Sequence, residues 1–157
     1  MKSVIKLEPV EVEEQNLHLI LNAQVNGKDV RLVLDTGASR TCFDYDYFVE
    51  IGAIGEDDHS DIELSGLGGL VSKNTITTVD SLTLGDFTLR DYFSVVTCLS
   101  AVNEVYSRVG VEEIHGILGG DLLKVFGAVI RYDRFELILK TRRKDYQNIR
   151  LKHPKIS

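Results

Sequence analysis

The sequence has few cysteines, few prolines and no long hydrophobic run. Its two cysteines, Cys42 and Cys98, are too few for a disulfide framework or a cysteine-rich metal cluster, so we expect both to be buried apolar residues. Two prolines exclude a proline-rich linker. A membrane-spanning helix needs about 20 apolar residues, and no stretch approaches that length. The first eight residues lack the apolar core of an export signal, so we expect a cytoplasmic chain without a membrane partner, with prior removal of an export signal as the alternative.

The composition predicts one soluble globular domain, with 157 residues of which 43% are hydrophobic and 27% charged. The net charge of −6 is uneven, because residues 140–157 hold seven Lys/Arg and one acid, a balance of +6, which leaves −12 on residues 1–139. An acidic body argues against nucleic acid as the main partner. We expect the basic segment to be a solvated terminus, with contact to an acidic partner as the alternative.

Short β-rich runs dominate the chain and predict a mainly β fold. Asn26-Gly27 between two such runs is a strong hairpin signal, because both residues tolerate positive φ. The other expected elements include short helices over 44–51, 101–109 (capped by Ser100, with one face packed in the core) and 122–126, and strands over 128–132 and 135–139.

The second strand of the hairpin runs directly into Asp35-Thr36-Gly37-Ala38-Ser39. The preceding run, 32–34, has no polar alternation and predicts a buried strand. An aspartate delivered at the end of a core strand is either bonded to its own turn backbone or used chemically. The tripeptide alone leaves both interpretations open.

Two glycine-rich segments follow. Residues 65–69 (Ser-Gly-Leu-Gly-Gly) lack the Lys-Ser/Thr of a phosphate-binding loop, which leaves a plain hairpin tip or a lid over a ligand. Residues 117–123 (Ile-Leu-Gly-Gly-Asp-Leu-Leu) place apolar residues against glycine, and Asp121 is expected to cap a helix.

These three motifs occur in the order found in retropepsin-like aspartic proteases, and the chain resembles the bacterial single-domain members over residues 17–139. The resemblance implies a closed β-barrel or β-sandwich with two or three short helices and one lobe per chain. An N-terminal arm or edge strand over 1–16 and a basic tail over 140–157 would flank this domain.

The resemblance also implies an aspartic-type endopeptidase that needs neither metal nor cofactor and acts on a peptide or protein substrate. No second Asp-Thr-Gly occurs, so the family's paired acids would come from a homodimer. The alternatives are a protease-fold module that binds peptides without cutting, or processing of one dedicated protein. The implied site residues are the catalytic Asp35; the active-site loop Thr36, Gly37, Ala38 and Ser39; the flap Gly66, Leu67, Gly68 and Gly69; and the loop support Ile117, Leu118 and Gly119.

Overall fold

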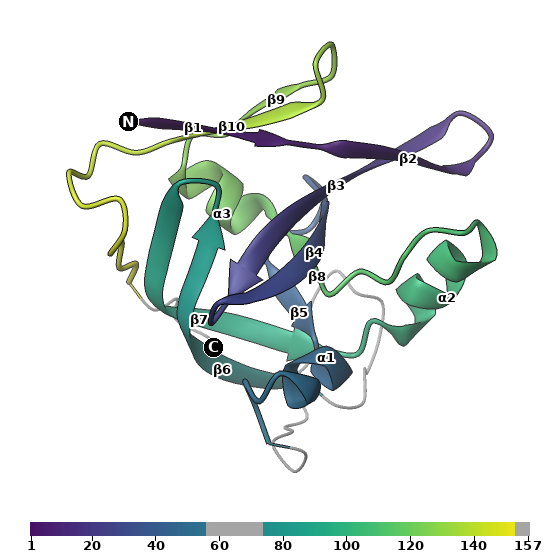
Figure 1. Cartoon of the computed structure of the whole chain (residues 1–157), viewed down its shortest axis with the longest axis horizontal. Helices are drawn as coiled ribbons and strands as arrows, with labels where there is room; N and C mark the ends of the chain where they lie inside the picture. The colour runs from purple at the N-terminus through teal and green to yellow at the C-terminus, as the bar shows by residue number, and fades with distance from the viewer. Residues whose placement is uncertain (56–73, 153–157) are drawn as a thin grey trace.

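A computed structural model of the chain describes residues 1–55 and 74–152. Within these residues the chain forms strands and three short helices, as Figure 1 shows. The strands are β1 (Lys2–Lys6), β2 (Glu8–Glu13), β3 (Asn16–Val25), β4 (Lys28–Leu34), β5 (Cys42–Asp44), β6 (Thr75–Leu84), β7 (Phe87–Thr97), β8 (Gly116–Leu118), β9 (Val129–Arg131) and β10 (Glu136–Lys140). The helices are α1 (Tyr45–Glu50), α2 (Ser100–Arg108) and α3 (Gly120–Val125).

Six strands form a closed barrel in the order β3-β4-β8-β5-β7-β6, and the pairing of β3 with β6 closes the ring. The mainly β prediction is therefore confirmed. The β3–β4 hairpin turns at Asn26 and Gly27 as predicted, with φ values of 51° and 77°. Pairing of β4 with β8 is parallel and joins segments far apart in the sequence, including Leu32 with Gly116. This pairing places the end of β4 beside the second glycine motif.

The apolar residues form two clusters. The larger fills the barrel and includes the fully buried Phe43, Phe87 and Leu32. The smaller lies between β3, β4, β5 and α2 and includes Ile20 and Tyr106. Ala38, which follows Asp35 by three residues, packs against this smaller cluster.

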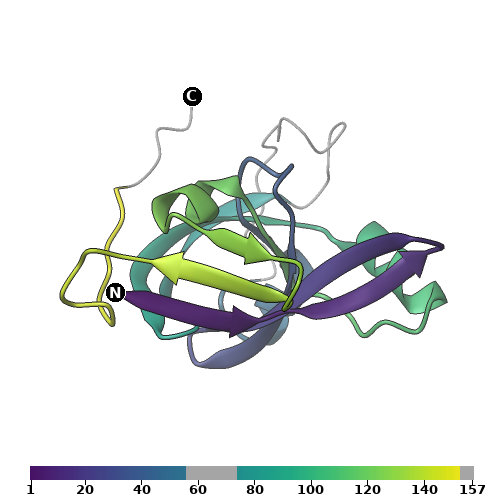
Figure 2. The same ribbon diagram turned by 90° about the horizontal axis from the view of Figure 1, so that it is seen from above.

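A second sheet, β1-β10-β9, joins the two ends of the described chain. Lys2 lies opposite Lys140 and Lys6 opposite Glu136 in antiparallel register, and Figure 2 shows β1 and β10 side by side. Alternate residues of β1, Ser3 and Ile5, face inward and are buried.

The described basic residues after β10 are exposed, but residues 146–151 also contact the barrel. Ile149 is only 1% exposed and exchanges backbone hydrogen bonds with β7, through Thr88 and Arg90. The Tyr146 ring lies against Phe87 at a centroid distance of 6.4 Å. This segment therefore covers an edge of the barrel.

The predicted helices form, with differences at their ends and faces. Asp44 caps α1 by accepting from the Tyr47 N–H, and Gly52 ends the turn with a φ of 74°. Helix α2 has no side-chain cap at Ser100. Instead, the N–H of Leu99, the residue before α2, donates to Asp44 Oδ1 at 2.9 Å. The two residues are 55 positions apart, so no local sequence pattern predicts this contact.

The apolar stripe of α2 was expected to lie in the core, and this is only partly so. Tyr106 is buried, but Val105 and Val109 remain 46% and 43% exposed. The spacing of apolar residues predicts which face of a helix is apolar, but not how much of that face neighbouring elements bury. Cys98, just before α2, is likewise half-exposed rather than buried, whereas Cys42 is buried as predicted.

Candidate active site

Asp35 follows β4 at the mouth of the barrel. Leu32 and Val33 before it are buried, as the run of apolar residues predicted. The Asp35 N–H continues the β4–β8 pairing by donating to the Leu118 carbonyl at 3.0 Å. Asp35 itself is exposed in the single chain. A rigid core strand therefore carries an acid to the surface.

The turn after Asp35 holds one oxygen of the carboxylate. The Gly37 N–H donates to Asp35 Oδ1 at 2.9 Å, and the Ala38 N–H donates to the Asp35 carbonyl at 3.2 Å. No other described residue donates to the carboxylate. Thr36, Gly37 and Ser39 are exposed beside it. The turn thus orients the carboxylate through Oδ1 and leaves Oδ2 available to a ligand or another molecule.

The second glycine motif lies directly against this turn. Ile117, Leu118 and Gly119 are all buried, and the Gly120 N–H donates to the Ala38 carbonyl at 2.7 Å. A Cβ atom on Gly119 would come within 2.7 Å of the Arg40 carbonyl carbon and oxygen. The close approach of the two loops therefore requires glycine at this position. The structure brings these residues together; their part in catalysis stays a prediction.

A partly buried aspartate connects the two loops from the other side. Asp121 Oδ1 accepts from the Thr41 N–H at 2.9 Å and from the Thr41 hydroxyl at 2.8 Å, while Oδ2 accepts from the Tyr92 hydroxyl at 3.2 Å. Thr41 Oγ1 in turn accepts from the Gly119 N–H at 3.0 Å. Burial and the negative charge of Asp121 raise the pKa of Tyr92 far above its ordinary value.

The expectation that Asp121 caps a helix is therefore wrong. Helix α3 begins at Gly120, its N-cap is Gly119, and the Asp121 side chain bonds across the barrel instead. Sequence reasoning missed Thr41 and Tyr92 because their partner lies 80 and 29 residues away along the chain. The one local indication of this hydrogen-bonded group was the hydroxyl side chain of Thr41, shortly after the Asp35 turn.

The smaller apolar cluster lies beneath the turn and contains two titratable groups, Cys42 and Tyr106. Burial, followed by the charge of Asp121, raises the pKa of the Cys42 thiol to about 12, so it is not a nucleophile at neutral pH. The Tyr106 hydroxyl is 2.7 Å from His18 Nδ1. Burial raises the pKa of Tyr106, and the negative charge of Asp35 adds to the effect. The Cys42 thiol and the Tyr106 hydroxyl beneath the turn are therefore uncharged at neutral pH.

His115 supports the strand that carries Asp35. Its Nδ1 accepts from the Arg31 backbone N–H at 2.9 Å, and its ring stacks on Tyr47 with 3.8 Å between centroids. Burial lowers the pKa of His115 below its ordinary value. Because Nδ1 is an acceptor here, the neutral ring carries its proton on Nε2. Sequence reasoning assigned no partner to this histidine.

Some predicted features lie outside what the structure describes. The four flap residues, Gly66, Leu67, Gly68 and Gly69, fall in the segment 56–73 and therefore outside the described residues. Among residues 1–55 and 74–152, no three His, Cys, Asp or Glu side chains gather into a group suited to a metal ion. No helix in the same residues is long and apolar enough to cross a membrane.

Comparison with known proteins agrees with this geometry. Residues 21–122 match the family model described as aspartyl protease. A retropepsin-like aspartic protease from Rickettsia conorii shares the fold with a TM-score of 0.56 and 21% identity, over 88% of this chain and 89% of that one. The retroviral protease-like domain of Ddi1 from Leishmania major aligns with a TM-score of 0.50 and 14% identity, over 74% of this chain and 82% of that one. No curated protein matches the chain.

The family match spans the Asp35 turn, the barrel and the glycine motif beneath the turn. The sequence identity between these structures and this chain is below 25%, so the similarity is evidence for the fold alone. Together these observations show that the chain belongs to the aspartyl protease family and has the retropepsin-like fold.

Proposed function

We propose that the protein is an aspartic endopeptidase that acts as a homodimer, with one Asp35 from each copy. The observation that carries this proposal is the state of Asp35 in the single chain. It is exposed at the end of a core strand, and among the described residues only the Gly37 N–H donates to its carboxylate, through Oδ1. A carboxylate fixed in this way is set to bond a partner outside its own chain.

The chemistry needs a second carboxylate beside the first. Two carboxyl groups about 3 Å apart cannot both ionise, so the pair shares one proton and titrates in two separated steps. The ionised member takes a proton from a water molecule held between the two acids, and that water attacks the peptide carbonyl. The protonated member donates to the carbonyl oxygen, and the member that took the water proton then gives it to the amide nitrogen as the carbon–nitrogen bond breaks. No side-chain nucleophile is required.

The second acid of the pair is supplied by the partner's Asp35 in this proposal. Asp121 is the other acid near the turn, but both of its oxygens already accept from Thr41 and Tyr92. A twofold axis through the Asp35 turns would place two identical surfaces together. Thr36 and Gly37 are small and exposed, which allows the backbones of two such turns to approach closely.

The surrounding residues would position the substrate. Ala38 and Ser39 continue the turn away from Asp35, and Ser39 is exposed where an extended peptide would pass. Gly66, Leu67, Gly68 and Gly69 would form the flap that covers the peptide. Ile117, Leu118 and Gly119 would keep the turn in place from below, through the contacts described above.

Replacing Asp35 by Asn tests the chemistry. Asn keeps the oxygen that accepts from Gly37 N–H but cannot serve as the general base, so we expect peptide cleavage to fall by about 1000-fold or more. Asp133→Asn, on an exposed turn, is the matched control and should cleave normally. Circular dichroism and light scattering should show the same fold and the same oligomer in all three proteins.

Mixing subunits tests the shared site. If each active site needs two acids, an equal mixture of wild-type and Asp35→Asn chains, after exchange, should retain about one quarter of the wild-type activity, since only one dimer in four has both. Independent single-chain sites would retain about half. Persistent activity in the pure Asp35→Asn protein would contradict the proposal. If the wild-type protein binds peptides but does not cleave them, the result would support the alternative of a non-catalytic peptide-binding module.

A further inference from the structure

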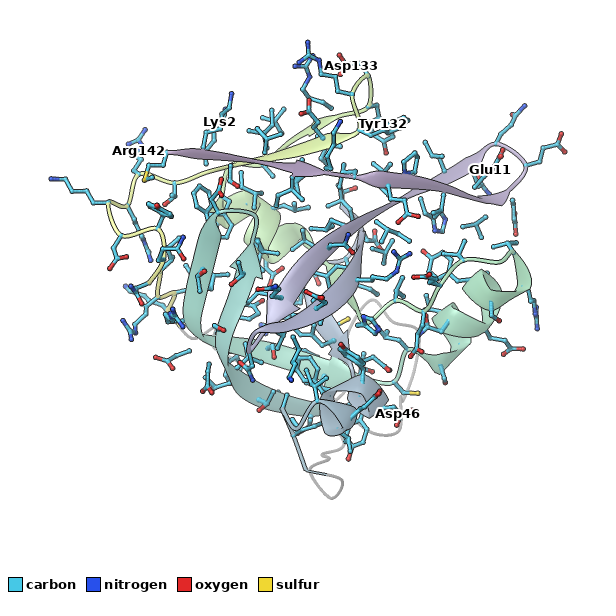
Figure 3. The ribbon with its side chains drawn as sticks, in the orientation of Figure 1. Lys2, Glu11, Asp46, Tyr132, Asp133 and Arg142 are labelled. Atoms are coloured by element: carbon cyan, nitrogen blue, oxygen red, sulfur yellow. The ribbon has the colours of Figure 1, made fainter. Side chains whose placement is uncertain are left out.

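The basic residues of the chain do not form one terminal tail in the folded protein. Five cations from three separate segments line a cavity of about 720 Å³ at one end of the β1-β10-β9 sheet, here called the basic cavity: Lys2, Lys124, Lys140, Arg142 and Arg143. No acidic residue among 1–55 and 74–152 lines it. Figure 3 shows Lys2 and Arg142 at this end of the sheet. The fold therefore concentrates positive charge on an otherwise acidic molecule.

The cations of the basic cavity have no acidic partner within the described chain. The ion pairs between described residues involve other arginines, namely Arg31, Arg108, Arg131 and Arg150. Lys2 and Lys140 lie directly opposite one another in neighbouring strands, both exposed. Like charges at opposed positions of a sheet repel and destabilise the pair. A bound anion would offset this repulsion.

The floor of the cavity does not compete for the cations. It lies at the end of α3, where backbone carbonyls normally remain open. Here the Lys124 carbonyl accepts from the Gly127 N–H, and the Phe126 carbonyl accepts from the Lys140 N–H at 2.7 Å. The side chains on this floor, Val125 and Phe126, are apolar. An occupant would thus meet charge at the rim and an apolar surface below.

The basic cavity shares one lining residue with a second cavity, which lies beside the active-site turn. Val125, which is 51% exposed, also lines a second cavity of about 510 Å³. That second cavity includes Ser39, Arg40 and Thr41, the residues that follow the Asp35 turn. Val125 therefore places the basic cavity next to the surface beside the Asp35 turn.

We propose that the basic cavity is an auxiliary binding site for an acidic segment of the protein substrate, outside the residues that are cut. The proposal rests on the proposed function, because it names the substrate class for that site. The five cations contribute +5 to a net charge of −6, so all other residues together carry −11. A long polyanion such as nucleic acid would run onto this negative surface, whereas a short acidic segment fits within the cavity.

Binding can be measured without cleavage by using the Asp35→Asn protein and a fluorescein-labelled hexaglutamate peptide. We expect the anisotropy signal to show binding that weakens with added salt. Lys140→Glu/Arg142→Glu should weaken it by about tenfold or more, since each reversal replaces an attraction with a repulsion. The matched control, Lys28→Glu/Arg134→Glu, has the same charge change on exposed turns and should alter affinity less than about twofold.

Equal losses in the two double variants would overturn the assignment of the site, as would absence of binding. Displacement of the peptide by duplex DNA or inorganic polyphosphate at lower concentration than by unlabelled hexaglutamate would overturn the assignment to an acidic segment.

Cleavage assays separate this proposal from the proposed function. A neutral peptide cut by the wild-type protein is compared with the same peptide carrying an acidic extension. We expect a lower KM for the extended peptide, lost in Lys140→Glu/Arg142→Glu, with kcat on the neutral peptide unchanged. Cleavage without this preference would overturn the auxiliary site and leave the endopeptidase proposal intact. Hexaglutamate binding in a protein that cuts nothing would support the site and contradict the endopeptidase proposal.

Discussion

Asp35 and Asp121 each follow a buried strand of the barrel, but their carboxylates differ in the number of hydrogen bonds they accept. Asp35 accepts from a single described donor, the Gly37 N–H, and is exposed. Asp121 accepts from three donors, two on Thr41 and one on Tyr92. A carboxylate whose oxygens are all bonded inside the chain stabilises the fold but is not available for proton transfer. The comparison shows how the same side chain serves structure at one site and chemistry, by our proposal, at the other.

The two sites are also coupled. Thr41 joins Asp121 to Gly119, and Gly119 lies against the backbone of residues 38–40. The hydrogen bonds of Asp121 therefore also stabilise the turn that contains Asp35. Four substitutions sharpen this contrast, beginning with the largest expected effect.

Asp121→Ala should destabilise the protein most. It leaves the Thr41 N–H, the Thr41 hydroxyl and the Tyr92 hydroxyl without their acceptor, and we expect the free energy of unfolding to fall by about 3–5 kcal/mol. Asp121→Asn can still accept and donate here and should recover much of the loss. Asp35→Asn should change the free energy of unfolding by less than about 1 kcal/mol. Urea denaturation of the three variants checks the contrast, and equal losses at Asp35 and Asp121 would remove it.

Gly119→Ala should damage the turn itself. The new Cβ would meet backbone atoms of Arg40 and Ala38 within 2.9 Å, so the loops must separate. We expect a loss of about 2–3 kcal/mol in stability, and a fall in cleavage of about 100-fold from displacement of Asp35. Gly120→Ala is the matched control, because its Cβ would lie 3.4 Å from the Ala38 carbonyl oxygen, an ordinary contact. Similar outcomes for the two neighbours would show that the close approach at Gly119 is unimportant.

Tyr92→Phe removes one hydrogen bond to Asp121 and leaves the ring in place. The expected loss is about 1 kcal/mol in the free energy of unfolding, measured by thermal or urea denaturation. Tyr132→Phe is the control, since Tyr132 is 62% exposed at the β9–β10 turn labelled in Figure 3. A loss at Tyr132 as large as at Tyr92 would mean that the Asp121 contact contributes nothing.

The smallest effect concerns His115, beside the strand that carries Asp35. Its pKa in the folded chain is lower than the ordinary 6.5, so the unfolded chain binds a proton more readily. This contribution to stability is present above pH 6.5 and is lost as the pH falls toward the folded-state pKa. Denaturation curves below pH 6.5 should be less pH-dependent in His115→Gln. An unchanged slope would show that protonation of His115 does not affect folding.

Sequence reasoning succeeded where the signal was local. The Asn26-Gly27 hairpin, helix α1, and the run of apolar residues before Asp35 each depend on residues a few positions apart. The order of the three motifs gave the family, which the comparisons confirm. The mainly β barrel followed from that resemblance and from the short β-rich runs.

Long-range contacts could not be predicted in the same way. The role of Asp121 depends on Thr41 and Tyr92, and the cap of α2 depends on Asp44; nothing near them in the sequence specifies these partners. The sequence did not predict the basic cavity, for the same reason. Residues 140–157 were expected to form a solvated tail, but the register of β1 against β10 brings Lys2 beside Lys140.

The hydrogen bonds between Thr41 and Asp121 span 80 residues of the chain. Until α3 has been synthesised and has docked beside Thr41, the Asp35 turn has only the local hydrogen bonds from the Gly37 and Ala38 N–H groups and lacks its contacts with Gly119 and Gly120. Closing so wide a loop is slow compared with forming the β3–β4 hairpin. The full set of contacts around the Asp35 turn therefore forms only after residues far apart in the sequence have come together, later than the hairpin that carries Asp35.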